Sequence, residues 1–234
     1  MKPQSDCFNQ IVSSCRGFIF SHRCSSYYLW NSSTGVHKQI PLSPLDSNLD
    51  AKYSCFRYGF GYDQSTDDCL VVSVYADTSL ALDIMFSRLE FFSLRNNTWK
   101  ELEATRTTYT IVTNQPKVGL FFNGSIRWLA RCPDLFMDVI IAFDLMERKL
   151  FDMPFRDCFD HEPRDWGLWV FGESLSLFAK DYVRRRVEIW VMKEYKVHSY
   201  WTLHLVLPID DISPIFFSPI CSTKSGDIVS TYND

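Results

Sequence analysis

The stretch that decides the fold is Tyr58–Asp68, which reads YGFGYDQSTDD. In its first half, aromatic residues alternate with Gly59 and Gly61, so every second residue of the expected strand lacks a side chain. A glycine inside a strand indicates that another backbone or a bulky ring packs closely there. The polar half has the composition of a turn, and the apolar run Leu70–Tyr75 follows it. We therefore predict a tight β-hairpin.

Weaker copies of this hairpin recur along the chain. Each copy has a glycine near its turn and is followed by an outer hairpin with a polar turn. The glycines lie about 44 to 63 residues apart and are Gly17, Gly61, Gly124, Gly172 and Gly226. The outer turns fall near Thr34, Asn97, Glu147 and Lys196. Four short strands in each repeat of roughly 40–50 residues predict an all-β, kelch-like β-propeller with about five visible repeats.

The alternative all-β architecture is a β-sandwich, which would need fewer strands than the roughly sixteen to eighteen that the pattern contains. We assign residues 1–10 to an N-terminal tail and residues 11–234 to a single propeller domain. The chain ends early in its last repeat, so closure of the ring is left open. Helices should be few, because no long stretch shows a period of 3.6 residues.

The composition excludes several classes of protein. The chain has 234 residues, 46% of them hydrophobic and 16% aromatic, and its formal net charge is −4. An acidic chain of this kind is not expected to bind nucleic acid or an anionic membrane. The N-terminus lacks the apolar core of a signal peptide, and apolar runs such as Val139–Phe143 are too short to span a bilayer. We expect a soluble protein of the cytoplasm, the nucleus or both.

The residues that could carry chemistry show no arrangement typical of a catalytic or metal site. The eight cysteines form no CxxC pair, and the five histidines have neither HExxH nor zinc-finger spacing. We interpret the cysteines as free and mostly buried thiols. Adjacent strand residues point to opposite faces, so Asp67–Asp68 and Asp210–Asp211 should cap turns, with Asp67 accepting backbone N–H bonds. We therefore predict no enzyme activity, no metal and no cofactor.

Several segments together resemble one known family. YGFGYDQSTDDCLVVSV resembles a segment of the F-box-associated domain of plant F-box proteins of the F-box/kelch-repeat type. Further matches occur in the same order from about Ile11 to Val229, and they are SCRGFIF, LWNSSTGVHKQIP, RLEFFSLRNNTWKELE, FFNGSIRWLA, VIIAFDLMERKLFDMP, VEIWVMKEYKVHSYW and FSPICSTKSGDIV. Each motif is weak by itself, but eight in register are specific. Cys69–Leu70 stand where the family usually has Tyr-Lys.

The resemblance implies a function in protein binding. The family is a β-propeller that recognises a target protein for a cullin–RING (SCF-type) ubiquitin ligase, while a separate helical F-box binds the Skp-type adaptor. The residues before Ile11 are too few to hold an F-box, so we expect the Skp-type adaptor and the cullin to associate only through an F-box that this chain lacks. The alternative functions are a carbohydrate-binding propeller and, less favoured, an enzyme on a propeller scaffold.

The partner-binding residues are expected in the loops between repeats, at 42–57, 103–117, 155–166 and 208–215, because loops on a rigid scaffold often carry function. Arg164 and Trp166 have the composition of a binding hot spot, and Trp169 is close by. We predict that one of these two tryptophans is partly exposed. Five other tryptophans should pack between sheets, and these are Trp30, Trp99, Trp128, Trp190 and Trp201. The basic cluster of Lys180 and Arg184–Arg186 is interpreted as a solvated hairpin loop rather than a nuclear-localisation signal.

Overall fold

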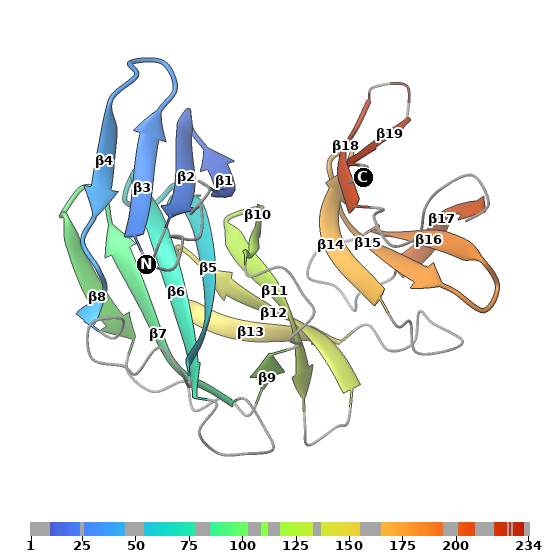
Figure 1. The fold of residues 1–234 in the computed structure, drawn as a ribbon. Coiled ribbons are helices and arrows are strands. Elements are labelled where there is room, and N and C mark those ends of the chain that lie inside the picture. Colours follow the sequence, from blue (N-terminus) through green and yellow to red (C-terminus); the bar gives the residue numbers. More distant parts are fainter. Residues whose placement is uncertain are drawn as a thin grey trace, which may run out of the picture. The chain divides into compact units, whose positions relative to one another are not determined.

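Antiparallel strands dominate the computed structural model of the protein (Figure 1). The structure describes residues 10–23, 26–44, 54–77, 85–102, 109–111, 118–132, 137–154, 165–193, 201–208, 218–223, 225 and 227–231. Across these ranges the all-β prediction is confirmed. None of the helical structure in them is long and apolar enough to cross a membrane.

The chain divides into two compact units. Unit 1 consists of residues 1–136 and 141–151, and unit 2 consists of residues 137–140 and 152–234. The single domain over residues 11–234 stays a prediction. Of the expected N-terminal tail, only Gln10 is described, and it begins the first strand.

Unit 1 opens with a four-stranded antiparallel sheet in the order β1-β2-β3-β4. Its strands are β1 (Gln10–Cys15), β2 (Phe18–Arg23), β3 (Ser26–Asn31) and β4 (His37–Ile40). Arg16 and Gly17 form the turn between β1 and β2 with φ values of 52° and 80°, a region that glycine adopts easily. The two predicted hairpins of this repeat are therefore confirmed.

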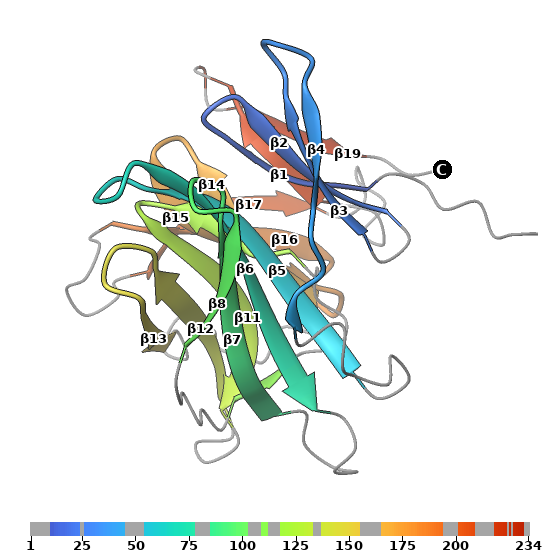
Figure 2. The same ribbon diagram turned by 90° about the vertical axis from the view of Figure 1, so that its left-hand side faces the viewer.

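The next two repeats form one larger sheet (Figures 1 and 2). The first contributes β5 (Ser54–Asp63), β6 (Asp68–Asp77), β7 (Met85–Ser93) and β8 (Thr98–Leu102), which lie side by side. The second contributes β10 (Leu120–Phe122), β11 (Ser125–Cys132), β12 (Met137–Asp144) and β13 (Lys149–Pro154). A strand of two residues, β9 (Thr110–Ile111), pairs with both β7 and β11 and joins the repeats. The sequence pattern placed these two residues in a loop, because so short a strand has no detectable period.

The strand β5 has a different neighbour on each face. Tyr58 and Phe60 face the first sheet, where the Tyr58 ring lies 4.9 Å from Tyr27 and the Phe60 ring 5.7 Å from Phe20. Both of these tyrosines and both phenylalanines are buried in one hydrophobic cluster. The glycines alternate with these aromatics and face β10 and β11, so β5 lies between two repeats.

The glycine positions of β5 leave no room for a side chain. A Cβ atom at Gly59 would lie 2.3 Å from Cγ2 of Ile126, and one at Gly61 would lie 2.4 Å from the Phe121 ring. The Trp128 indole also packs here and donates a hydrogen bond to the Tyr58 carbonyl at 3.0 Å. The prediction that bulky groups pack against these glycines is confirmed.

Unit 2 contains a four-stranded antiparallel sheet and a hairpin. The sheet has the order β14 (Asp165–Phe171), β15 (Ser174–Asp181), β16 (Arg186–Met192) and β17 (Trp201–Pro208), and the hairpin consists of β18 (Ser218–Ser222) and β19 (Ile228–Thr231). Trp169, Val187 and Ile189 form the buried core of this sheet. The exposed turn between β15 and β16 contains Arg184 and Arg185, as predicted for the basic cluster, but Lys180 is buried in β15 and is not part of the loop.

The tryptophans predicted to pack between sheets differ in how far they are exposed. Trp128 and Trp201 are buried, and Trp99 and Trp190 are half-buried. Trp30 is 44% exposed, so the packing prediction is wrong for this residue. Trp30 belongs to the outer pair of strands β3 and β4, where it lies opposite His37 in the register.

Candidate functional site

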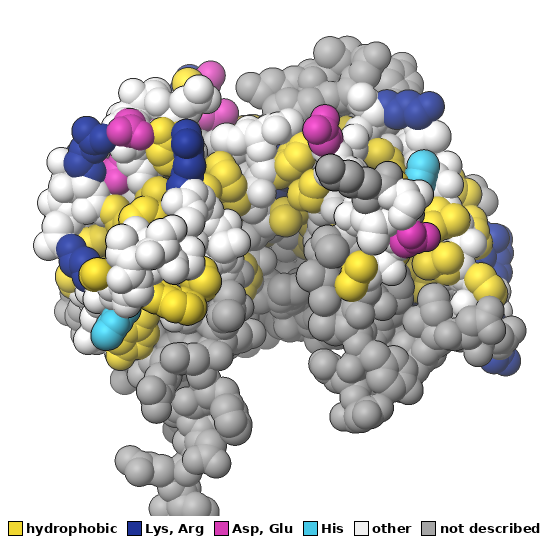
Figure 3. Space-filling view, turned by 90° about the horizontal axis from the view of Figure 1, so that it is seen from above, with side chains coloured by type: hydrophobic (Ala, Val, Ile, Leu, Met, Phe, Trp, Pro, Cys, Tyr) yellow, Lys and Arg dark blue, Asp and Glu magenta, His cyan; other side chains and the backbone are white. Residues whose placement is uncertain are grey.

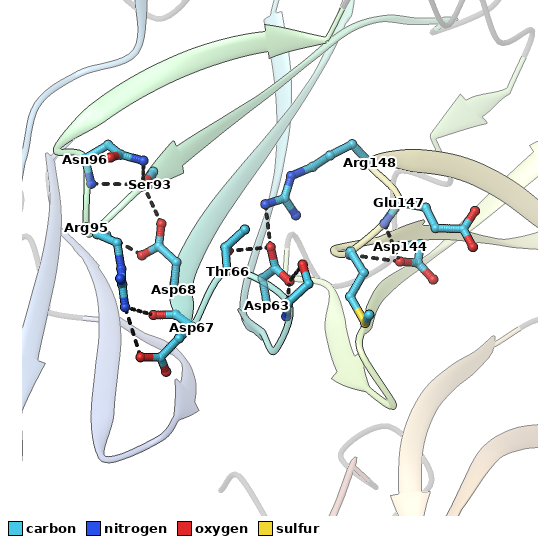
Figure 4. A network of polar contacts seen from close by, with 12 residues as sticks. Asp63, Thr66, Asp67, Asp68, Ser93, Arg95, Asn96, Asp144, Glu147 and Arg148 are labelled. Atoms are coloured by element: carbon cyan, nitrogen blue, oxygen red, sulfur yellow. Dashed lines mark hydrogen bonds and ion pairs between the residues drawn. The ribbon is translucent and has the colours of Figure 1, made fainter.

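The hairpin turns of unit 1 gather at one end of its sheets. The Ser32 amide donates to the Gly17 carbonyl at 3.0 Å, which joins the two turns of the first sheet. In the same way the Leu145 amide donates to the Gly124 carbonyl at 3.0 Å. Side chains make the remaining connections between turns, and Figure 4 shows several of them. We call this end of unit 1 the turn face.

Asp63 holds the turn between β5 and β6 and connects it to the turn between β12 and β13 (Figure 4). Its buried carboxylate accepts the Ser65 amide at 2.9 Å, the Ser65 and Thr66 hydroxyls at 2.6 Å, and the Arg148 guanidinium at 2.6 Å. Burial raises the pKa of Asp63, but the hydrogen bonds from Ser65, Thr66 and Arg148 outweigh it and lower the pKa to about 2. Asp63 is therefore an anion that fixes the geometry of the turn face.

The two aspartates that end the decisive stretch have different roles. Asp67 accepts the Tyr62 hydroxyl at 2.6 Å and pairs with Arg95 at 2.9 Å. Asp68 is buried, where it accepts the Ser93 hydroxyl and the Arg95 amide. The prediction that Asp67 caps its own turn is wrong. Asp63 at the start of the turn is the cap, because its side chain can reach the amide two residues later.

A pocket of about 720 Å³ opens between these turns and the turns of the first sheet. Its floor is apolar and includes Phe18, Leu29, Cys69 and Leu94. These residues belong to, or pack against, the cluster that fills the space between the two sheets. At the turn face, the side chains of this cluster do not fill the space between the two sheets, and a hollow remains. We call this hollow the turn pocket.

The thiol on the floor of the turn pocket is chemically inert. Burial raises the pKa of Cys69 to about 11, with smaller contributions from Cys15 and Asp68. Because the thiolate is the reactive form of cysteine, Cys69 acts as a small apolar group at neutral pH. Cys15 and Cys69 are free thiols, as predicted for the cysteines. Across the described residues, no group of three or more His, Cys, Asp or Glu side chains is placed to hold a metal ion.

Cations line the rim of the turn pocket. The Arg16 guanidinium lies 4.1 Å from the centre of the Tyr62 ring. Lys38 on β4 donates to the side-chain oxygen of Asn97 at 2.5 Å. Arg95 is the third cation of the lining, and its pairing with Asp67 is given above. Figure 3 looks down on the turn face, and its left part shows basic and acidic side chains interspersed with hydrophobic ones.

The partner-binding residues predicted from the sequence lie in unit 2. Arg164 falls outside the described residues. Trp166 and Trp169 lie in β14, each is only 3% exposed, and Trp169 packs against Phe171 with ring centres 5.5 Å apart. Neither tryptophan is partly exposed, so that expectation is wrong. A binding role for the three residues stays a prediction.

The turn pocket was missed by sequence reasoning, which favoured the loops between repeats. Most residues of those loops lie outside the described ranges. Arg16 and Lys38 gave a weak signal, since each is a basic residue next to a predicted hairpin turn. Their common pocket depends on two sheets meeting, which no local pattern encodes.

Comparison with known proteins identifies relatives along the whole chain. A sequence model of the F-box associated beta propeller domain matches residues 1–234. The chain is 24% identical over 216 residues to an F-box/kelch-repeat protein of Arabidopsis thaliana, an alignment that covers 90% of this chain and 57% of the relative. It is 27% identical to the F-box protein CPR1 of the same plant, over 82% of this chain and 51% of the relative.

A third Arabidopsis relative, also an F-box protein, is 25% identical over 99% of this chain and 61% of its own length. The chain thus spans between 51% and 61% of the length of the relatives it matches. These matches confirm the family resemblance and the β-propeller fold class predicted from the sequence.

Proposed function

The chain belongs to the family of F-box associated β-propeller domains, and we propose that it binds a target protein as the substrate-recognition part of an SCF-type cullin–RING ubiquitin ligase. An F-box segment joined to such a domain recruits the Skp-type adaptor and, through it, the cullin. The chain itself acts by binding and performs no catalysis. We propose that it works in the cytoplasm or the nucleus.

The observation that carries the proposal is the turn pocket on a rigid face. Buried ion pairing at Asp63 and tight packing at Gly59 fix the strands that surround it. A concave apolar site with a few polar groups on a preformed scaffold is the usual form of a recognition site. The family supports a protein destined for ubiquitination as the class of ligand, and the pocket supports the turn face as its proposed binding place.

The test joins this chain to the F-box segment of the matched F-box/kelch-repeat relative and expresses the fusion in Arabidopsis cells with the proteasome inhibited. Proteins captured by the fusion are identified by mass spectrometry, and their ubiquitination is compared with that in cells that express the F-box segment alone. We expect at least one protein that is both captured and more heavily ubiquitinated. The proposal fails if no captured protein gains ubiquitin.

The carbohydrate-binding alternative requires exposed aromatic side chains next to Asp or Asn. Trp30 is the tryptophan of the described residues that is clearly exposed, and it lies outside the turn pocket lining. A glycan array probed with the chain distinguishes the two functions, because a sugar-binding propeller gives a defined glycan signal and our proposal predicts none.

A further inference from the structure

We propose that the turn pocket recognises an acidic segment of the target protein, with one apolar side chain on the pocket floor and carboxylates at Arg16 and Lys38. This inference rests on the proposed function, because it names the part of the target that the chain binds. It follows from the floor, the rim charges and the size of the pocket.

The apolar floor of the turn pocket favours an apolar side chain of the target protein. Phe18 and Leu94 are partly buried and border the space above the buried Leu29 and the neutral Cys69 thiol. Covering such a surface removes apolar area from water, which is favourable by roughly 25 cal/mol per Å². On the rim, Val36 is 65% exposed and extends the apolar surface outward. An aliphatic or aromatic side chain is therefore the natural occupant.

The cations on the rim of the turn pocket favour negatively charged side chains of the target protein. The lining contains three cations and two carboxylates, and one of those carboxylates, Asp68, is already buried among its own hydrogen-bond donors. Among the described residues, no carboxylate lies within ion-pair distance of Arg16 or Lys38. The direct contacts of both side chains are with neutral groups, an aromatic ring and an amide oxygen. The Asp67 carboxylate interacts with Arg16 only through longer-range electrostatics, so both cations can still pair with a ligand.

This rim is unusual for the chain as a whole. The net charge of the protein is −4, so a local excess of cations over an apolar hollow marks a place that differs from the average surface. Complementary charge speeds association and excludes wrong partners more than it adds affinity. A short acidic segment would therefore be selected here over a basic or neutral one.

The ligand is better matched as a carboxylate than as a phosphate. Phosphate recognition favours several arginines that bind with paired hydrogen bonds. Here Arg95 is engaged by Asp67, and the exposed Asp67 carboxylate would repel a dianion more strongly than a single charge. The volume of about 720 Å³ lies within the roughly 300–1,000 Å³ of typical ligand sites, so it suits a few residues of chain.

The test measures binding of fluorescent peptides to the intact chain by anisotropy. The first peptide has one leucine flanked by glutamates, the second has the same leucine flanked by lysines, and the third has a serine flanked by glutamates. We expect binding of the first alone, weakened by added salt because the attraction is electrostatic. Lys38→Glu should weaken this binding by about tenfold or more. Arg16→Asn should act in the same direction, since asparagine tolerates the positive φ at this position.

Two matched variants serve as controls. Lys100→Glu makes the same charge change on the exposed strand β8, outside the pocket lining, and should leave peptide binding unchanged. Asn97→Gly removes the hydrogen bond of Lys38 but keeps its charge, and glycine suits the φ of 53° there, so binding should persist. Thermal melting confirms that every variant is folded.

The inference is overturned if the three peptides bind equally, if none binds, or if Lys38→Glu and Lys100→Glu weaken the first peptide equally. These failures are distinguishable from failure of the proposed function. If the F-box fusion with Lys38→Glu still captures its target and the target is still ubiquitinated, the proposed function is retained and only the acidic segment is refuted as the recognised feature.

Discussion

The two faces of β5 differ in how closely they pack against their neighbours. On one face, Gly59 and Gly61 bring the strand so close to β10 and β11 that no Cβ atom fits. On the other face, Tyr58 and Phe60 fill the space toward the first sheet with large rings. These rings and their neighbours fill the space between the sheets in the middle of the strands. At the turn face the space is not filled, and the turn pocket opens there.

The glycine face of β5 is therefore expected to contribute to stability, and the aromatic face to recognition. The glycine face has no spare volume, so it can hold the neighbouring repeat in a fixed position. The aromatic face has spare volume at one end, and that volume is bordered by cations on turns. A substitution on the first face should therefore alter folding, and a substitution at the pocket rim should alter binding.

The largest effect is expected from Gly59→Val, because even a single Cβ atom at this position would lie only 2.3 Å from Cγ2 of Ile126. Overpacking of this kind costs about 3 kcal/mol of unfolding free energy, and urea denaturation measures it. Thr98→Val on the exposed strand β8 adds the same residue without a clash and sets the baseline. Equal unfolding midpoints for the two variants would refute the closed glycine face.

The next effect is expected from Asp63→Asn. The pKa of Asp63 is lowered to about 2, so its contribution to stability is present above the unfolded pKa near 3.8 and is lost as the pH falls toward about 2. At neutral pH the substitution should cost about 2 kcal/mol. Urea midpoints measured down this pH range should converge for the native chain and the variant, whereas a constant difference would contradict the role of Asp63 as a buried anion.

A smaller effect is expected from Tyr62→Phe, which removes the hydroxyl that donates to Asp67. The Tyr62 hydrogen bond is the main cause that lowers the pKa of Asp67; burial opposes it, and Arg95 and Arg16 lower the pKa by smaller amounts. The pKa of Asp67 should therefore rise toward its ordinary value in the variant, as measured by NMR titration of its carboxyl carbon. An unchanged pKa would show that the arginines alone set the charge at the pocket rim.

The smallest effect is expected from Lys149→Ala, which removes the ion pair with Glu147 at 3.5 Å on the turn face. Both side chains are mostly exposed, and such pairs contribute little because water screens them. The melting temperature and peptide binding should both stay at the native values. A clear loss of either would extend the functional surface beyond the turn pocket.

The fold was largely predictable from the sequence because its signals are local. Alternation of glycine with aromatic residues around Gly59 and Gly61 identified β5, and the dipeptide Asn123–Gly124 identified its neighbouring hairpin. Short strands with frequent turns then indicated a propeller. The strand β9 was not predicted, because a strand of two residues has no alternating pattern. Its pairing also depends on β7 and β11, which are distant from it in the sequence.

The candidate site was not predictable in the same way. Trp166 and Trp169 have the composition of a hot spot, but aromatic residues in a strand are equally suited to a core, and the structure buries both. Lys38 and Asn97 lie 59 residues apart and meet only because two sheets are adjacent. Local composition can identify a turn, whereas a pocket between turns requires the tertiary arrangement.

Site-specific photocrosslinking tests the central claim, that target proteins bind at the turn face, most directly. A photoreactive amino acid replaces Val36 at the rim of the turn pocket, and in a second chain it replaces Val183, which is 88% exposed on unit 2. We expect the captured target protein to crosslink to position 36 and not to position 183. Crosslinking at position 183 alone, with capture intact in both chains, would contradict the assignment of the turn pocket as the binding site.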